Sequence, residues 1–179
     1  MQKIARSLIV ITAVIFSSCS PNQSLQEYYV DSTENPNFLA FDIPTSLLNT
    51  DLAELTPEQK MAYESLRKLN VLAFKITPEN TEAYKTEKAK VEAILGNDSY
   101  EELMKINTGF GKASIRFKGA EDAIDEVIIF GENKEKGFAI VRVLGKDMNP
   151  AHLAQFLQVL EKSDFDVEQF GQISELFKS

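Results

Sequence analysis

The sequence predicts an α+β fold, in which helices pack on one face of an antiparallel β-meander sheet. Three observations predict this class. Two helix starts of the form Thr-Pro, at Thr56 and Thr77, occupy the first half of the chain. Four strand patterns follow between residues 100 and 144, and an amphipathic pattern begins at Asn149. Helices, then consecutive strands, then a helix favour helices layered on a single sheet.

Each Thr-Pro site combines a capping hydroxyl with proline at the first helical position. The first helix is expected to present Ala62, Leu66 and Leu69 on one face. The second is expected to end at Gly96 and to combine a buried stripe with charged pairs on its exposed side. The stripe consists of Tyr84, Val91, Ile94 and Leu95, and the pairs are Glu82 with Lys85 and Glu87 with Lys90.

The strands are predicted from apolar and β-branched residues that alternate or form short runs. Residues 38–52 start the domain with a short strand or turn and a short helix. The further strands are expected at 71–76, 100–107, 113–118, 124–130 and 138–144. The last two are apolar on both sides, as central strands are, and the glycine-bracketed polar turn 131–137 predicts that they pair as an antiparallel hairpin.

The last helix is predicted from Asn149-Pro150 onward. Its inward face is formed by Leu153, Phe156, Leu157 and Leu160, at helical spacing. Residues 164–179 repeat apolar side chains in a way that predicts a short terminal helix, either docked on the domain or facing a partner.

The N-terminus has the order of a secretory signal peptide: a basic start with Lys3 and Arg6, an apolar run at 8–16, then small residues. The run is shorter than the roughly 20 apolar residues that a spanning helix needs. Residues 16–19, Phe-Ser-Ser-Cys, resemble the lipobox of bacterial lipoproteins, in which the cysteine is acylated with chains such as palmitate and becomes the first mature residue. The resemblance implies lipidation of Cys19. The alternative is an ordinary signal peptide that is cut nearby and leaves a free thiol.

Three regions follow from these patterns: a lipoprotein signal peptide at 1–18, a lipid-anchored tether at 19–37 and a single α+β domain at 38–179. The tether assignment rests on polar turn formers at 20–24 and 31–36, although apolar residues between them leave open that part of it packs on the domain. Residues 31–33, Asp-Ser-Thr, resemble a short bacterial O-glycosylation signal with Ser32 as the acceptor. The alternative is a solvated turn.

The chain is acidic, with 27 acidic and 19 basic residues among 179 and a net charge of −8. Removal of residues 1–18 takes away Lys3 and Arg6 and leaves a charge of −10. Nucleic acid is therefore excluded as a partner, because phosphate binding needs a basic patch. Anionic headgroups would repel the domain, so the membrane is expected to be contacted through the lipid, and two or more acyl chains give stable attachment.

Candidate chemistry is sparse. His152 is the one histidine and Cys19 the one cysteine, too few for a zinc site, and a catalytic triad would have to use His152. The densest carboxylate group is Glu121, Asp122, Asp125 and Glu126, with Asp147 further along, and its spacing matches no calcium loop. We expect no catalytic residue, no metal and no cofactor. Glu126 and Asp147 are the carboxylates that a hydrolase would use.

Several segments from Leu66 to Leu160 carry a family resemblance. They are residues 100–104 (YEELM), 113–118, 125–129 (DEVII) and 141–149 (VRVLGKDMN). They resemble a family of small Bacteroidota-type lipoproteins that carry a domain of unknown function, number 4252. The resemblance implies an envelope location and an α+β domain, and it implies no reaction.

The sequence therefore predicts a lipid-anchored binding or interaction module of the cell envelope, not an enzyme, with an unknown ligand or an envelope protein as partner. Acidic residues just after the cysteine resemble a signal for export to the cell surface. Residues 20–23 carry no acidic side chain, which favours the periplasmic face of the outer membrane. Two alternatives stay open. One is a hydrolase of envelope glycan or polymer, and the other is a structural lipoprotein without a ligand.

Overall fold

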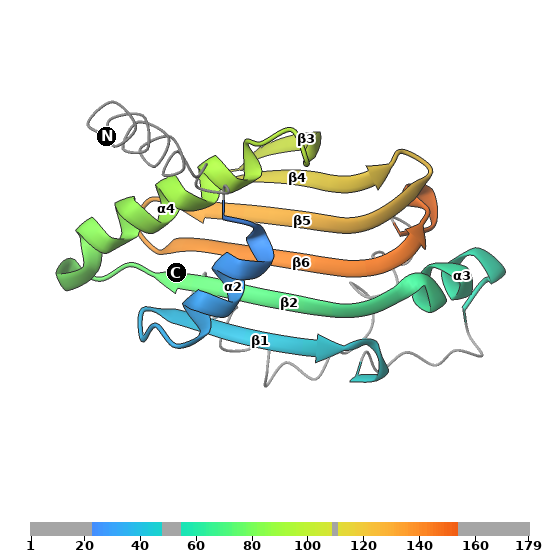
Figure 1. Ribbon diagram of the computed structural model, residues 1–179, viewed down its shortest axis with the longest axis horizontal. Helices are drawn as coiled ribbons and strands as arrows, with labels where there is room; N and C mark the ends of the chain where they lie inside the picture. The colour runs from blue at the N-terminus through green and yellow to red at the C-terminus, as the bar shows by residue number, and fades with distance from the viewer. Residues whose placement is uncertain (1–22, 48–54, 109–110, 154–179) are drawn as a thin grey trace, which may run out of the picture.

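In the computed structural model, which describes residues 23–47, 55–108 and 111–153, the strands form one six-stranded antiparallel sheet (Figure 1). Their order across the sheet is β1-β2-β6-β5-β4-β3. The strands are β1 (Phe38–Pro44), β2 (Leu66–Lys75), β3 (Glu101–Thr108), β4 (Gly111–Ala120), β5 (Ala123–Asn133) and β6 (Gly137–Met148). β3 to β6 form a meander, and the predicted hairpin is β5 with β6. The predicted α+β class with an antiparallel meander is confirmed.

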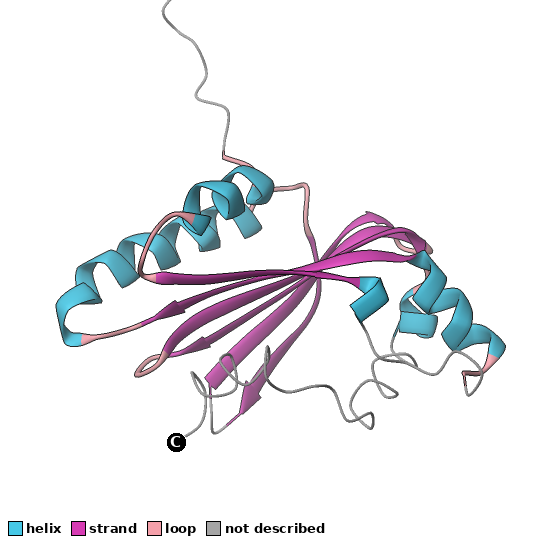
Figure 2. Cartoon of the chain, turned by 90° about the horizontal axis from the view of Figure 1, so that it is seen from below, coloured by secondary structure: helices cyan, strands magenta, loops and turns pink. Residues whose placement is uncertain are grey.

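Two helices lie over the same face of the sheet, and a third lies at one end of it (Figure 2). The first two are α2 (Leu25–Thr33) and α4 (Thr81–Leu95), and the third is α3 (Pro57–Ser65). Short 3₁₀ turns, η1 (Thr45–Leu47) and η2 (Pro78–Asn80), follow β1 and precede α4. The helix expected at Asn149 begins as predicted, since Asn149 Oδ1 accepts the backbone N–H of Ala151 at 2.9 Å. Residues 154–179, where the terminal helices were predicted, lie outside the described residues.

The two Thr-Pro sites start helices as predicted. At Thr56, the hydroxyl accepts the Gln59 N–H at 3.3 Å and the Gln59 side chain accepts the Thr56 N–H at 2.9 Å, a complete capping box. Thr77 opens η2, which leads into α4. The charged pairs that α4 was expected to carry, Glu82 with Lys85 and Glu87 with Lys90, are both present at 2.7 Å.

One boundary differs from the prediction. The helix expected to reach Leu69 ends at Ser65, and β2 begins at Leu66 rather than at 71. Leu66 and Leu69 share a helical spacing with Ala62, but β2 is paired with β1 on one side and with β6 on the other. Two ladders of backbone hydrogen bonds outweigh a helical pattern of three residues.

The N-terminal part of the domain also differs. Residues 25–33, assigned to the tether, form α2, and Leu25 and Tyr28 are each only 2% exposed. A capping box starts this helix, because the Ser24 hydroxyl accepts the Glu27 N–H at 3.2 Å and the Glu27 carboxylate accepts the Ser24 N–H at 2.8 Å. Apolar side chains at helical spacing outweighed the polar turn formers that suggested a linker. The domain therefore includes α2 as well as residues 38–153, and residues 1–22 lie outside the described range.

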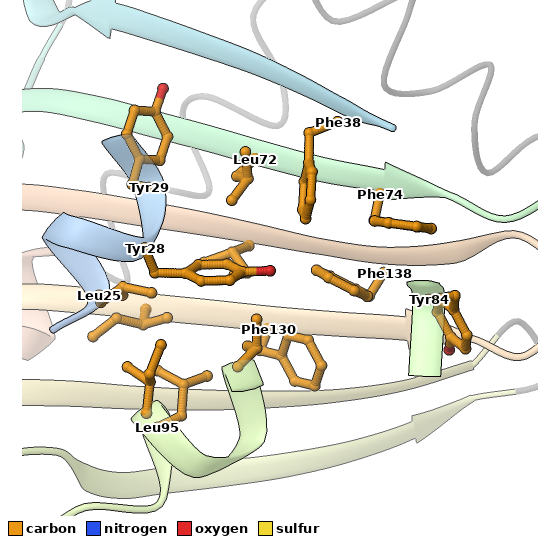
Figure 3. Packing of buried hydrophobic residues seen from close by; sticks show 14 residues of the cluster. Leu25, Tyr28, Tyr29, Phe38, Leu72, Phe74, Tyr84, Leu95, Phe130 and Phe138 are labelled. Carbon is orange, nitrogen blue, oxygen red and sulfur yellow. The ribbon is translucent and has the colours of Figure 1, made fainter. Parts of the chain in front are cut away.

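The core between the helices and the sheet is aromatic (Figure 3). Phe38 of β1, Phe74 of β2 and Phe138 of β6 lie side by side, with ring centroids 5.0 Å apart for Phe38 and Phe74 and 5.6 Å apart for Phe74 and Phe138. Such pairs contribute about 0.5–1.5 kcal/mol each beyond the burial of area. Tyr28 from α2 and Tyr84 from α4 pack on these rings from the helix side, against Phe38 and Phe138 respectively.

The opposite face of the sheet is apolar as well. Strand registers place the following side chains there: Leu39, Phe41, Ile43, Val71, Ala73, Ala113, Ile115, Phe117, Val127, Ile129, Ala139, Val141, Val143, Met104 and Ile106. Ala62 and Tyr63 of α3, together with Leu153, pack against this second core. Among the described helices, α2 and α4 thus cover one face, and α3 contributes to the other at one end.

Candidate functional site

On the helix side of the sheet, the aromatic core gives way to polar side chains at β4 and β3. Lys112, Ser114 and Arg116 alternate along β4, and Lys105 and Asn107 lie opposite them on β3. Polar residues therefore follow one side of both strands, while the alternating positions point to the apolar face. At the β4–β3 end of the sheet, the helix-side face thus presents charged and hydrogen-bonding side chains that can contact a polar ligand.

A cavity of about 200 Å³ opens at this end, between the last turns of α4 and the strands. Its lining consists of Glu92 and Leu95 from α4, Lys105 and Asn107 from β3, Lys112, Ala113, Ser114 and Arg116 from β4, and Phe130 and Glu132 from β5. Leu95 and Phe130 belong to the aromatic core, so the cavity has an apolar part beside a charged part. This combination is typical of small-molecule sites.

The two carboxylates of the lining, Glu92 and Glu132, share one lysine of α4. Lys88 forms an ion pair with Glu132 and lies 3.6 Å from Glu92. The hydrogen bond to Glu132 is the main cause that raises the pKa of Lys88, so this lysine keeps its charge. Lys88 thus compensates one of the two negative charges on the α4 and β5 side of the cavity.

Arg116 holds the cavity wall together. Its guanidinium donates a hydrogen bond to the carbonyl oxygen of Leu95 in the last turn of α4, and its Nη2 lies 3.3 Å from the Glu102 carboxylate. A cation at the C-terminus of a helix is stabilised by the helix dipole. Arg116 Nε is buried and has no hydrogen-bond partner among the described residues, which leaves one donor of this guanidinium unused.

The two lysines at the cavity differ in their pairing. Lys105 forms an ion pair with Glu102 at 2.9 Å, so this carboxylate is shared by Lys105 and Arg116. Lys112 forms no ion pair with a described residue. Four cations, Lys88, Lys105, Lys112 and Arg116, thus face three carboxylates, Glu92, Glu102 and Glu132, which leaves one excess positive charge at this end of a chain whose net charge is −8. Such a site attracts a carboxylate or phosphate group.

A second polar cluster lies beneath α2 and has a structural role. Arg142 of β6 and Glu126 of β5 are 8% and 5% exposed and form an ion pair at 2.5 Å. Arg142 also donates to the Gln26 side chain of α2. Glu126 was a candidate carboxylate for hydrolysis, and this pairing leaves it buried and engaged.

Tyrosines surround that cluster. The Tyr29 hydroxyl donates to the Asp42 carboxylate at 2.9 Å and thereby ties α2 to β1. Burial, with a smaller effect from Glu126, raises the pKa of Tyr100 to about 12. Tyr28 and Tyr29 have their pKa raised further, again mainly by burial. These phenols remain neutral at physiological pH.

The remaining candidate residues are dispersed. Glu121, Asp122 and Asp125 are exposed around the β4–β5 turn, Asp147 is exposed near the end of β6, and His152 lies partly exposed in the last described helical turn. No group of three or more His, Cys, Asp or Glu side chains within the described ranges is arranged to hold a metal ion. The described helices include none with the length and apolarity to cross a bilayer.

Two modification candidates have different outcomes. Cys19 lies outside the described residues, so its lipidation stays a prediction. Ser32 lies in α2 and is 5% exposed. Its hydroxyl is therefore not presented to solvent by the folded domain, and its glycosylation stays a prediction. The alternative of a solvated turn is wrong, because residues 31–33 are helical.

The cavity residues were not singled out from the sequence. The alternation of Ser114 and Arg116 with apolar residues predicted the strand correctly, and it carried a partial signal, since it placed these polar side chains together on one side. Leu95 and Glu92 line the cavity because the end of α4 lies over this part of the sheet, and no local sequence pattern predicts that position.

Fold and site together define a class: an α+β domain with helices over a six-stranded antiparallel sheet and a small cation-rich cavity beside its β3 edge. The chain belongs to the family described as "Domain of unknown function (DUF4252)", whose model matches residues 28–156. This match begins inside α2, in agreement with the inclusion of that helix in the domain.

No curated protein matches the chain. Among solved structures, a crystal structure of PA94, a protein of unknown function from Pseudomonas aeruginosa, is similar at 10% sequence identity and a TM-score of 0.33. The alignment covers 70% of this chain and 77% of that one. A similarity at this level supports no conclusion about fold or function.

Proposed function

We propose that the protein is a lipid-anchored binding module of the bacterial cell envelope, whose ligand site is the cavity between α4 and strands β3 to β5. The cavity itself carries the proposal, because it places Lys112, a cation without an ion-pair partner among the described residues, beside an apolar wall in an otherwise acidic chain. The hydrolase and ligand-free alternatives stay predictions, since no observation in the described residues favours either.

The ligand is expected to present a carboxylate or phosphate group. Lys112 supplies a cation without a partner among the described residues, and Asn107 and Ser114 supply neutral hydrogen-bonding groups next to it. Hydrogen bonds that involve a charged group stabilise by about 1.5–3 kcal/mol. A cavity of about 200 Å³ is smaller than most drug-sized sites, so we expect it to receive a small molecule or one acidic group of a larger one.

Envelope attachment is supported by the signal-like N-terminus, and the charge of the domain favours attachment through a lipid over direct contact with headgroups. With residues 1–18 removed the charge is −10, which disfavours direct binding to anionic headgroups. Attachment through acyl chains on Cys19 would hold such a domain at the membrane, with the periplasmic face of the outer membrane as the expected location.

Binding can be tested by NMR titration of the isotope-labelled protein with succinate and with inorganic phosphate. We expect chemical-shift changes at β3, β4 and the end of α4, and at least tenfold weaker binding in Lys112→Gln. Lys118→Gln is a matched control, because Lys118 is an exposed lysine of the same strand outside the cavity lining. Equal binding by both variants, or no site-specific shifts with either anion, would contradict the assignment of the cavity.

Anchoring needs a separate test. The wild type and Cys19→Ala are produced in a host that processes lipoproteins and compared by intact mass and detergent partitioning. We expect added acyl mass and detergent-phase partitioning for the wild type alone. If both proteins stay in the aqueous phase, the anchor is wrong, whereas the cavity assignment is unaffected.

A further inference from the structure

β3 is the most exposed strand of the sheet. It lies at the edge, and all residues from 101 to 107 are exposed. Leu103, Met104 and Ile106 are 51%, 47% and 40% exposed, and they account for three of the five exposed large apolar residues in the described ranges. An edge strand with free backbone groups and apolar side chains is a template for the addition of another strand.

The opposite edge is better protected. At β1, the Tyr29 hydroxyl from α2 shares its proton between the Asp42 carboxylate and the Phe41 carbonyl oxygen, which lies 3.1 Å away, and the strand ends in Pro44. A proline and an engaged carbonyl both reduce the pairing capacity of an edge. No described helix makes a comparable contact with β3, so the two edges differ in their readiness to accept a partner.

The side chains of β3 are sorted by face. Glu102 lies opposite Arg116 and Lys105 opposite Ser114, which places both charges on the helix side. Met104 and Ile106 lie opposite Ile115 and Ala113, on the apolar side. The register shift between Glu102 and Met104 makes this possible, because it brings residues three apart onto one face.

We propose that two copies of this chain associate by antiparallel pairing of β3 with β3. Antiparallel pairing with the same strand can set each Lys105 opposite the Glu102 of the other copy, so that two opposite-charge pairs form on the helix side. In this register, Met104 of each copy lies opposite Leu103 of the other copy, at the centre of the paired strands. Charge complementarity of the strand with itself thus selects a second copy as the occupant, rather than an unrelated strand.

The same features discourage other partners. A strand bulge and a lysine are devices that keep edges from pairing indiscriminately. A foreign strand would have to reproduce both the charge order and the irregular spacing at Leu103, whereas a second copy does so by symmetry. The edge is therefore selective and not merely open.

The test uses residues 19–179 with Cys19→Ser, so that neither a lipid nor a terminal disulfide can join two copies. Analytical ultracentrifugation in ligand-free buffer over a concentration series is expected to show a reversible dimer. Lys105→Glu and Glu102→Lys should each weaken dimerisation by about tenfold or more, because each places two like-charge pairs across the interface. Lys118→Glu, on the neighbouring strand, should leave it unchanged.

Mixing the two single variants is decisive. A heterodimer of Lys105→Glu with Glu102→Lys restores both opposite-charge pairs between chains, while the contacts within each chain stay like-charged. We therefore expect the mixture to dimerise more strongly than either variant alone, and circular dichroism must show that each variant is folded. A wild type that is monomeric at every concentration, a dimer that both variants leave intact, or a mixture without recovery would each overturn the proposal.

Discussion

Arg116 of β4 donates a hydrogen bond to the carbonyl oxygen of Leu95, and so attaches the end of α4 to a strand outside the aromatic core. The contact satisfies a terminal helix carbonyl that has no partner within the helix. It also fixes the wall of the cavity, since both residues line it. Stability of the helix end and geometry of the candidate site therefore depend on the same guanidinium.

Substitution of Arg116 tests this dependence. Arg116→Leu should lower the free energy of unfolding by about 1–3 kcal/mol, because a charged hydrogen bond to the helix end is lost. The measurement is urea denaturation followed by circular dichroism. Arg116→Lys keeps the charge but not the fork of donors and should lie between the leucine variant and the wild type. A leucine variant as stable as the wild type would mean that the contact contributes nothing.

The buried pair of Arg142 and Glu126 predicts strong non-additivity. Each single change, Arg142→Met or Glu126→Leu, leaves a buried charge without its partner and should cost about 3–5 kcal/mol. The double variant removes both charges and should be much less destabilised than the sum of the single changes. Chemical denaturation of all four proteins provides the double-mutant cycle. Simple additivity would show that the two side chains are energetically independent.

We expect alanine to be tolerated at one of two glycines of the β5–β6 hairpin and not at the other. Gly137 has a φ of +125°, and a Cβ there would collide with the Phe74 carbonyl oxygen of the adjacent strand. Gly131 has open space around the same position. Gly137→Ala should therefore destabilise the domain by more than about 2 kcal/mol, and Gly131→Ala should be near neutral. Thermal unfolding of the two variants compares them directly, and equal melting temperatures would contradict the collision.

The buried phenols predict loss of stability at alkaline pH. The pKa of Tyr100 is about 12 in the folded chain, above the ordinary value of 10.0, so the folded state favours the neutral phenol. Its contribution is complete below pH 10 and is lost as the pH rises from 10 to about 12. Urea denaturation at pH 9 and pH 11 should show this decline, and Tyr100→Phe should reduce it. An identical decline in the phenylalanine variant would assign the effect to other groups.

Local signals predicted most elements, and they failed where tertiary pairing decides. The cap at Thr56, the helix start at Thr77, the buried stripe of α4 and the β5–β6 hairpin all depend on residues close in sequence, and all are confirmed, although the Thr77 hydroxyl makes no capping hydrogen bond. Leu66 and Leu69 were misassigned to a helix because their strand is defined by neighbours more than 20 residues away.

The candidate site was less predictable than the fold, for a physical reason. Lys105, Arg116 and Leu95 come together only because α4 crosses the sheet at the β3–β4 end. A sequence pattern indicates which side of a strand is polar, but not which helix end will meet it. The same holds for Glu126, which looked like an available carboxylate until its partner on β6 was known.

The position of β6 has a consequence for how the chain folds. This strand is the last of the sheet to be synthesised, yet it lies between β2 and β5 and joins them. Before residues 137–148 are synthesised, β1 and β2 can form only a two-stranded sheet, and β3, β4 and β5 can form only a separate three-stranded sheet. Such long-range pairing slows folding. The nascent chain therefore cannot close this sheet before residues 137–148 have been synthesised.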